Sequence, residues 1–169
     1  AAMGATPRWV VLAGSLPDAD ETWIAAFADG FFACARRYRV DLVGGDTTRG
    51  PLNLCVTALG EVPAGAALHR AGAHSGDDLW VSGQPGLAAL GLAHLQGRTQ
   101  LPEKLAARCL AALQKPTPRI ELGLALLNRK LAHAAIDISD GLLADLGHLA
   151  KGSGLAPQPP HPRPPPLPP

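Results

Sequence analysis

The chain has 169 residues, 47% of them hydrophobic, and a formal net charge of +1. This near-neutral balance gives no electrostatic case for binding nucleic acid or a charged membrane surface, and the apolar runs are far shorter than the roughly 20 residues that a membrane-spanning helix needs. The three cysteines are widely spaced and form no C-x-x-C pair, which argues against a zinc site or a disulfide framework and favours reduced thiols in a cytoplasmic protein.

The first third of the chain predicts an α/β arrangement. Residues 9–17 are apolar and β-branched and end in proline, which is typical of a strand. A helix is predicted over 18–38, because acids crowd its first turn and arginines its last. Strands are predicted over 40–45 and 52–62, and Cys34 is expected to pack beside the apolar stripe of the helix. Strand, helix, strand, strand is an α/β pattern.

The remainder of the chain is predicted to alternate loops, helices and short strands. Residues 65–78 are rich in glycine and alanine and are expected to connect two domains. A short buried strand is predicted over 79–83, and another strand, followed by a turn, over 134–141. The predicted helices cover 85–95, 101–115 and 116–131, and a last one begins at 142.

Four segments follow from these patterns. The expected organisation is a partial N-terminal domain (1–63), a connector (64–77), a partial C-terminal domain (78–153) and a disordered tail (154–169). Nine of the seventeen prolines lie in the last thirteen residues, where they prevent helix and sheet formation. The tail is open to three interpretations: an SH3-ligand-like segment, an unstructured end, or the out-of-frame end of a truncated gene. Because position 1 is not methionine, the chain is expected to begin inside a longer protein.

The most unusual stretch is the sequence GGDTTRG at residues 44–50. Paired glycines let a backbone approach a ligand closely and offer N–H groups to phosphate oxygens. Asp46 supplies the hard oxygen ligand that Mg²⁺ prefers, and the hydroxyls of Thr47 and Thr48 can bond phosphate or cap a turn. The alternative is a tight turn in which Asp46 bonds the backbone and Arg49 faces solvent.

A second motif, DISDG, occupies residues 137–141. Strand alternation places Asp137 and Ser139 on one face, and the following turn brings Asp140 close. Carboxylates so near repel one another unless a cation or a proton lies between them, so the motif favours a metal site. The alternative is that Ser139 or Asp140 caps the helix that begins at Leu142.

Other candidates are weaker. Arg70 in the connector is placed to reach a phosphate, although a solvated arginine is the plainer interpretation. The six histidines are scattered and are interpreted as surface or packing residues. No Ser-His-Asp arrangement or activated cysteine is indicated, so no catalytic side chain is assigned.

Four segments together resemble the bacterial thiamine-monophosphate kinase family, which is similar to aminoimidazole ribonucleotide synthetase and selenophosphate synthetase. They are AAMGATPRWVVLAGSLPDADETWIAAFADG, DLVGGDTTRGPL, TALGEVPAGAALHRAGAHSGDDLWVSGQPG and AIDISDGLLADLGHLAK. They occur in the family's order between residues 1 and 153, and the words GGDTTRGP and DISDGL are the most specific.

The resemblance implies ATP-dependent phosphorylation of thiamine monophosphate to thiamine diphosphate with Mg²⁺. It makes the N-terminal domain the partial ATP- and Mg²⁺-binding domain. Carried over by motif, Mg²⁺ would be held by Asp46, Asp137 and Asp140. The nucleotide would be contacted by Gly45, Asp46, Arg70 and Ser139. The implied fold is two incomplete α/β subdomains of the aminoimidazole ribonucleotide synthetase kind.

The chain also departs from the family's pattern. Relatives carry an upstream segment with a GDD metal motif and a DTLVEGVHF-like strand, and their C-terminal part stands where this chain has its proline tail. A truncated kinase is therefore expected, with a sheet that pairs into a homodimer in the full-length enzyme. The alternatives are another ATP-using synthetase of the selenophosphate or aminoimidazole ribonucleotide type, and a non-catalytic interaction protein that uses the tail.

Overall fold

The computed structural model describes residues 1–155, so the predicted proline tail lies outside the described residues except for its first two positions. Contacts between Cα atoms divide the chain into two compact units. The first contains Ala1–Ala67 and Arg119–Arg129, and the second contains Leu68–Pro118 and, of the later residues that the structure describes, Lys130 to Leu155. Among the described residues, none of the helices combines the length and the apolar character needed to cross a membrane.

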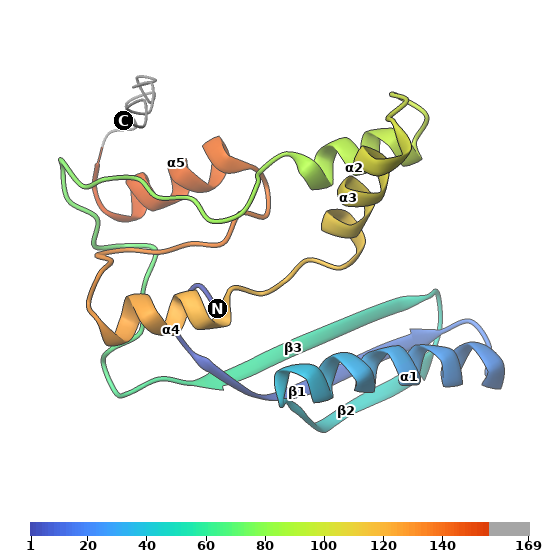
Figure 1. Ribbon diagram of the computed structural model, residues 1–169. Helices are drawn as coiled ribbons and strands as arrows, with labels where there is room; N and C mark the ends of the chain where they lie inside the picture. Colours follow the sequence, from blue (N-terminus) through green and yellow to red (C-terminus); the bar gives the residue numbers. More distant parts are fainter. Residues whose placement is uncertain (156–169) are drawn as a thin grey trace. The chain divides into compact units, whose positions relative to one another are not determined.

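The first unit is built on a three-stranded sheet with the order β2-β1-β3 (Figure 1). Strand β1 (Thr6–Leu16) pairs in parallel with β2 (Asp41–Arg49) and antiparallel with β3 (Asn53–Glu61). Helix α1 (Glu21–Tyr38) makes the crossover that a parallel pair requires. The predicted mixed α/β class is confirmed.

Helix α1 begins and ends where its sequence directs. The side chain of Asp20 accepts hydrogen bonds from the backbone N–H groups of Thr22 and Trp23, which satisfies two free donors of the first turn. The helix closes at Arg39, whose backbone is left-handed with φ 55°.

The expectation that α1 buries an apolar stripe, with Cys34 packed beside it, is wrong. No residue of α1 is buried, and Cys34 is exposed. The aromatic side chains instead stack along the helix itself, with the rings of Trp23 and Phe27 parallel at 5.5 Å. Rings four residues apart share one side of a helix, so they cover one another without a second layer.

Helix α4 (Ile120–Asn128) joins the first unit through the N-terminal residues. Gly4 lies against Leu127, and a Cβ on Gly4 would stand 2.7 Å from the Leu127 Cβ. Gly123 of α4 likewise lies against the backbone of Ala1. Small residues at both positions therefore let the start of the chain lie directly on the helix.

The second unit contains α2 (Leu87–Leu95), α3 (Glu103–Gln114) and α5 (Leu142–Gly152). Helices α2 and α3 pack side by side (Figure 1), and Gly91 marks their close approach. A Cβ on Gly91 would stand 2.6 Å from the backbone oxygen of Cys109, whose side chain is fully buried. A glycine on one helix and a small buried thiol on the other explain this tight packing.

Two predicted strands of the second unit do not form. Residues 79–83 and 134–141 are extended or bent without strand pairing, and Trp80 is 87% exposed. An apolar run becomes a strand only when a neighbour satisfies its backbone N–H and C=O groups. In the described part of the chain the only sheet is the one formed by β1, β2 and β3, so these runs find no partner strand.

Gly45 is the position where β2 most needs a glycine. It pairs with Leu12 of β1, and its backbone φ angle is 145°. Residues with a Cβ atom rarely adopt this angle, whereas glycine does so readily. A Cβ at this position would overlap the carbonyl oxygen of Leu12. The adjacent Gly44 has no such restriction, since its Cβ would meet only a Val11 methyl at 3.9 Å.

Replacing Gly45 by alanine should therefore destabilise the first unit by about 2 kcal/mol or more, because strain and overlap occur together. Urea unfolding followed by the fluorescence of Trp9 and Trp23, which lie in this unit, measures the change. Gly44→Ala is the matched control and should change the free energy of unfolding by less than about 1 kcal/mol. Equal effects of the two substitutions would contradict this role of Gly45.

Candidate functional site

The GGDTTRG motif forms the end of β2 and the residue after it. Residues 44–49 are strand, and each of them is exposed. The predicted alternative of a tight turn is wrong for these residues, because they continue the parallel ladder with β1 as far as the pair Leu16 and Arg49. Gly50 then ends the strand and donates its N–H to the Leu16 carbonyl at 2.9 Å.

Asp46 stands on the exposed strand with one carboxylate oxygen in use. Its Oδ1 accepts a hydrogen bond from the backbone N–H of Thr47 at 2.8 Å, which fixes the carboxylate beside the strand. The other oxygen is the one available to a ligand. The backbone bond foreseen in the turn alternative therefore exists, but inside a strand, and it leaves Asp46 able to contact a cation.

The DISDG motif forms the loop that enters α5, and a single buried carboxylate organises it. Asp145, in the first turn of α5, is only 5% exposed. Its Oδ2 accepts hydrogen bonds from the backbone N–H groups of Ser139, Asp140 and Gly141 at 2.9, 3.1 and 3.2 Å. The loop is thus wrapped around a carboxylate from the helix that follows it.

This arrangement also decides the capping alternative. The N-cap of α5 is Gly141, with φ 124°, and no side chain caps the helix. The side chains of Ser139 and Asp140 are therefore not used as caps. They remain exposed, and only their backbone N–H groups bond Asp145.

Asp137 is held ionised beside this loop. The Ser139 hydroxyl donates to Asp137 Oδ2 at 2.6 Å. This hydrogen bond and then the Asp137 backbone N–H lower the pKa of Asp137 below its ordinary value; burial opposes them, and the positive charge of Arg70 lowers the pKa by a lesser amount. Asp137 and Ser139 lie close together, as their alternation in sequence predicts.

Arg70 approaches the same loop because the connector runs beside it. The N–H of Ala135 donates to the His69 carbonyl at 2.9 Å, and the Ser153 hydroxyl accepts from the N–H groups of Gly72 and Ala73. These bonds tie residues 69–73 to both ends of the DISDG and α5 region. Arg70 therefore lies in the same unit as Asp137, near enough for its charge to act on that carboxylate.

Asp140 belongs to a cluster with Asp145 and His148. One ligand atom from each of the three lies within 4.8 Å of the others. Two carboxylates and an imidazole at this spacing match the donor set of a divalent cation site. Asp137 is not part of this cluster, so the structure pairs Asp140 with acceptors from α5 and pairs Asp137 with Ser139.

Of the predicted site residues, four lie in the second unit: Arg70, Asp137, Ser139 and Asp140. Gly45 and Asp46 lie in the first unit. Asp137, Ser139 and Asp140 lie in the loop before α5, where Asp137 pairs with Ser139 and Asp140 lies with Asp145 and His148, and Arg70 lies in the connector near enough to act on Asp137. Their roles toward a nucleotide or a metal remain predictions.

Sequence reasoning missed Asp145, which organises the loop. An aspartate in the first turn of a helix is common as a favourable charge for the helix dipole, so its sequence position gave no sign of burial. The sequence does contain one signal. Asp145 follows Ser139, Asp140 and Gly141 by four to six residues, and at this interval a side chain in the first turn of a helix can reach the loop that precedes the helix.

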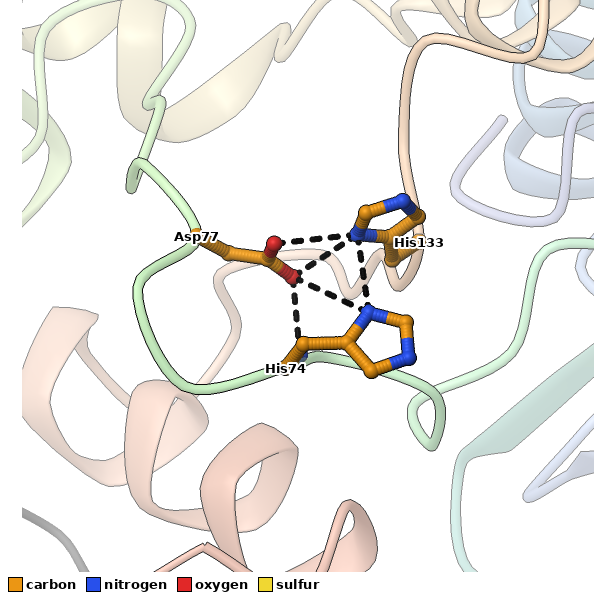
Figure 2. Close-up of side chains that lie close together, drawn as sticks. All are labelled: His74, Asp77 and His133. Carbon is orange, nitrogen blue, oxygen red and sulfur yellow. Dashed lines mark hydrogen bonds and ion pairs between the residues drawn. The ribbon is translucent and has the colours of Figure 1, made fainter.

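A second cluster was missed as well. His74 and His133 were interpreted as surface or packing residues, yet their Nδ1 atoms lie 3.1 Å apart and both face the carboxylate of Asp77 (Figure 2). The two histidines are 59 residues apart in the sequence, so no local spacing connects them.

Replacing Asp145 by alanine should release the DISDG loop, because three backbone donors lose one charged acceptor. Amide hydrogen exchange at Ser139, Asp140 and Gly141 should accelerate by about tenfold or more, which is about 1.4 kcal/mol. Asp140→Ala is the matched control, since that exposed side chain accepts none of these bonds. Unchanged exchange in Asp145→Ala would show that Asp145 does not hold the loop.

The chain is similar to proteins of known family. Residues 1–62 match the family model "AIR synthase related protein, N-terminal domain". The chain is 52% identical over 155 residues to thiamine-monophosphate kinase from Salmonella typhimurium, covering 91% of this chain and 47% of that protein. The chain spans about half the length of the curated relatives it matches.

Solved structures agree with this result. The crystal structure of thiamine-monophosphate kinase from Stenotrophomonas maltophilia K279a matches with a TM-score of 0.81 and 53% identity, over 90% of this chain and 49% of that one. AaThiL complexed with AMPPCP and TMP matches with a TM-score of 0.76 and 30% identity, again over 90% of this chain and 49% of that one. The chain is thus a relative of the thiamine-monophosphate kinases over nine-tenths of its own length, and it corresponds to about half of theirs.

Proposed function

We propose that the protein to which this chain belongs transfers a phosphoryl group from ATP to thiamine monophosphate and forms thiamine diphosphate. The observation that carries this proposal is the 52% identity, over 91% of this chain, to a thiamine-monophosphate kinase. The AMPPCP and TMP bound to the related AaThiL support ATP and thiamine monophosphate as the two substrates.

The carboxylates of the second unit fit a Mg²⁺ site. Mg²⁺ takes oxygen ligands and usually keeps several waters, so it suits exposed carboxylates better than a closed protein cage. Asp140 is exposed beside Asp145, and Asp137, whose pKa is lowered chiefly by the Ser139 hydroxyl, is a carboxylate that is ionised at neutral pH. Asp137 and Asp140 would hold the ion in the second unit, and Asp46 is proposed as a metal ligand of the first unit. Bound Mg²⁺ neutralises charge on the triphosphate.

The remaining predicted contacts are directed at the nucleotide. Arg70, whose positive charge already acts on the DISDG loop, would pair with phosphate oxygens. The Ser139 hydroxyl donates to Asp137 in this structure. When ATP binds, this hydroxyl would accept a hydrogen bond from ATP, or would rotate and donate one to it. Gly45 keeps β2 close to β1 and so fixes the place of Asp46.

No side chain is proposed as a general base or nucleophile. The accepting group is a phosphate, which already carries negative charge and needs no deprotonation at neutral pH. Phosphoryl transfer of this kind depends on positioning and on charge neutralisation rather than on covalent chemistry. The chain's carboxylates and Arg70 supply groups for both tasks, which is why the assigned residues all bind rather than react.

The first unit supports a homodimer of the full-length enzyme. Strands β2 and β3 are the two edges of the sheet, and every residue of both strands is exposed. Apolar side chains among them include Val43, at 59% exposure, and Val56, at 48%. Pairing through this sheet would cover these groups and the unpaired strand edges. We also propose that the chain is organised as an N-terminal domain ending at residue 63 and a C-terminal domain beginning at residue 78. A cytoplasmic location of the protein is a further proposal.

A chimera tests the proposed activity. The matched 155 residues of the Salmonella typhimurium kinase are replaced by the corresponding residues of this chain, and thiamine diphosphate formation from ATP and thiamine monophosphate is measured. The chimera should form thiamine diphosphate. Asp137→Asn in the chimera should lower kcat about 100-fold or more, because charge neutralisation at the triphosphate is lost.

Asp29→Asn, an exposed carboxylate on α1, is the matched control and should leave kcat unchanged. A folded chimera that makes no thiamine diphosphate would contradict the proposed function. An active chimera that tolerates Asp137→Asn would retain the function and refute the assigned site. Formation of selenophosphate or of aminoimidazole ribonucleotide from the appropriate substrates would instead favour another synthetase of the superfamily.

A further inference from the structure

The side chains of His74, Asp77 and His133, all in the second unit, converge where the end of the connector meets residue 133 (Figure 2). The Nδ1 atom of His133 lies 3.0 Å from Asp77 Oδ1 and 2.9 Å from Oδ2. The Nδ1 atom of His74 lies 3.1 Å from His133 Nδ1 and 3.9 Å from Asp77 Oδ2. Two ring nitrogens and one carboxylate therefore face a common point.

A single proton cannot satisfy every acceptor of this cluster at once. A neutral imidazole carries one N–H, and its second nitrogen is an acceptor. If the proton of His133 is on Nδ1, that single N–H faces three acceptors: both carboxylate oxygens of Asp77 and the Nδ1 atom of His74. It can form a good hydrogen bond with only one of the three. If both rings carry the proton on Nε2, two nitrogen lone pairs and a carboxylate point at one another. A cation satisfies all the acceptors together, because each lone pair can bind it.

The spacing matches a tetrahedral ion. Metal–ligand bonds of about 2.0–2.1 Å to nitrogen and oxygen give ligand–ligand distances of roughly 3.3 Å in a tetrahedron. The three measured edges, 2.9, 3.1 and 3.9 Å, lie on either side of that value. The longest edge joins His74 to Asp77, and a rotation of the His74 ring, whose side chain is 68% exposed, would shorten it.

The backbone holds the ligands in place before any ion binds. The N–H of His74 donates to Asp77 Oδ2 at 2.8 Å, and the N–H of Asp77 donates to the His74 carbonyl at 3.2 Å. Gly76 closes this turn with φ 96°. A Cβ on Gly72 would stand 2.7 Å from the His133 carbonyl oxygen, so only a glycine lets the two loops approach this closely.

We propose that His74, Asp77 and His133 form a binding site for a divalent transition-metal ion of the Zn²⁺ class. Imidazole nitrogen favours Zn²⁺, Ni²⁺ and Cu²⁺, whereas Mg²⁺ takes oxygen ligands, so this site differs in chemistry from the carboxylate site. Three protein ligands leave the fourth position to water or to an external ligand. The site is exposed and open to solvent, and it would join residues 74–77 to residue 133.

Calorimetric titration of the 169-residue chain with Zn²⁺ tests the site. The cysteines are first alkylated so that the exposed thiols of Cys34 and Cys55 do not compete. One Zn²⁺ should bind per chain, with affinity that survives an excess of Mg²⁺. His74→Ala and His133→Ala should each weaken binding at least about tenfold, the smallest effect expected for loss of a direct ligand.

His69→Ala is the matched control, because His69 is an exposed histidine of the same connector outside the cluster. It should bind Zn²⁺ as the unchanged chain does, and circular dichroism establishes that all variants keep their helices. Co²⁺ in place of Zn²⁺ should show the absorption of a tetrahedral ion, lost in His133→Ala. Absent binding, or equal binding by all variants, would overturn the proposal. Binding lost only in His148→Ala would assign the ion to the carboxylate cluster instead and would also overturn it.

Discussion

The carboxylate of Asp145 is the interaction on which the candidate site of the second unit depends. It is buried, and it accepts three backbone hydrogen bonds from the loop that precedes its own helix. A buried carboxylate without partners would be strongly unfavourable, so loop and helix are stable in this form only together. Because the backbone N–H groups of the loop satisfy Asp145, that carboxylate takes no bond from the exposed side chains of Asp137, Ser139 and Asp140. Structural and functional roles are thus divided among neighbouring acids.

A comparable constraint governs the first unit. Asp46 can lie at its place on β2 only because Gly45 lets that strand pair closely with β1, and the pairing extends to the end of the motif. In both units the residue that fixes the backbone is distinct from the one offered to solvent. The same division is found at the histidine cluster, where Gly72 and Gly76 shape the loops and His74, Asp77 and His133 face one another.

Much of the secondary structure could be predicted from local signals, since caps and periodicity set α1, β1, β2, β3 and the later helices within a few residues. The failures share one physical cause. Residues 79–83 and 134–141 have strand-like composition, but a strand also needs a partner, which local sequence does not reveal. Cys34 was expected to pack because it neighbours an apolar stripe, yet no second layer covers that stripe. Asp145 and the pair His74 and His133 were missed because burial and long-range approach decide their roles.

The central proposal is that the acids of the DISDG loop, Asp137 and Asp140, hold a metal–nucleotide complex. Mn²⁺ prefers the same oxygen ligands as Mg²⁺ and broadens the amide signals of nearby residues, so it reports even weak binding. Adding Mn²⁺-ATP to the isotope-labelled chain should broaden residues 137–141 first, and Asp137→Asn with Asp140→Asn should abolish that broadening. Broadening confined to other parts of the chain, or unchanged in that double variant, would contradict the account.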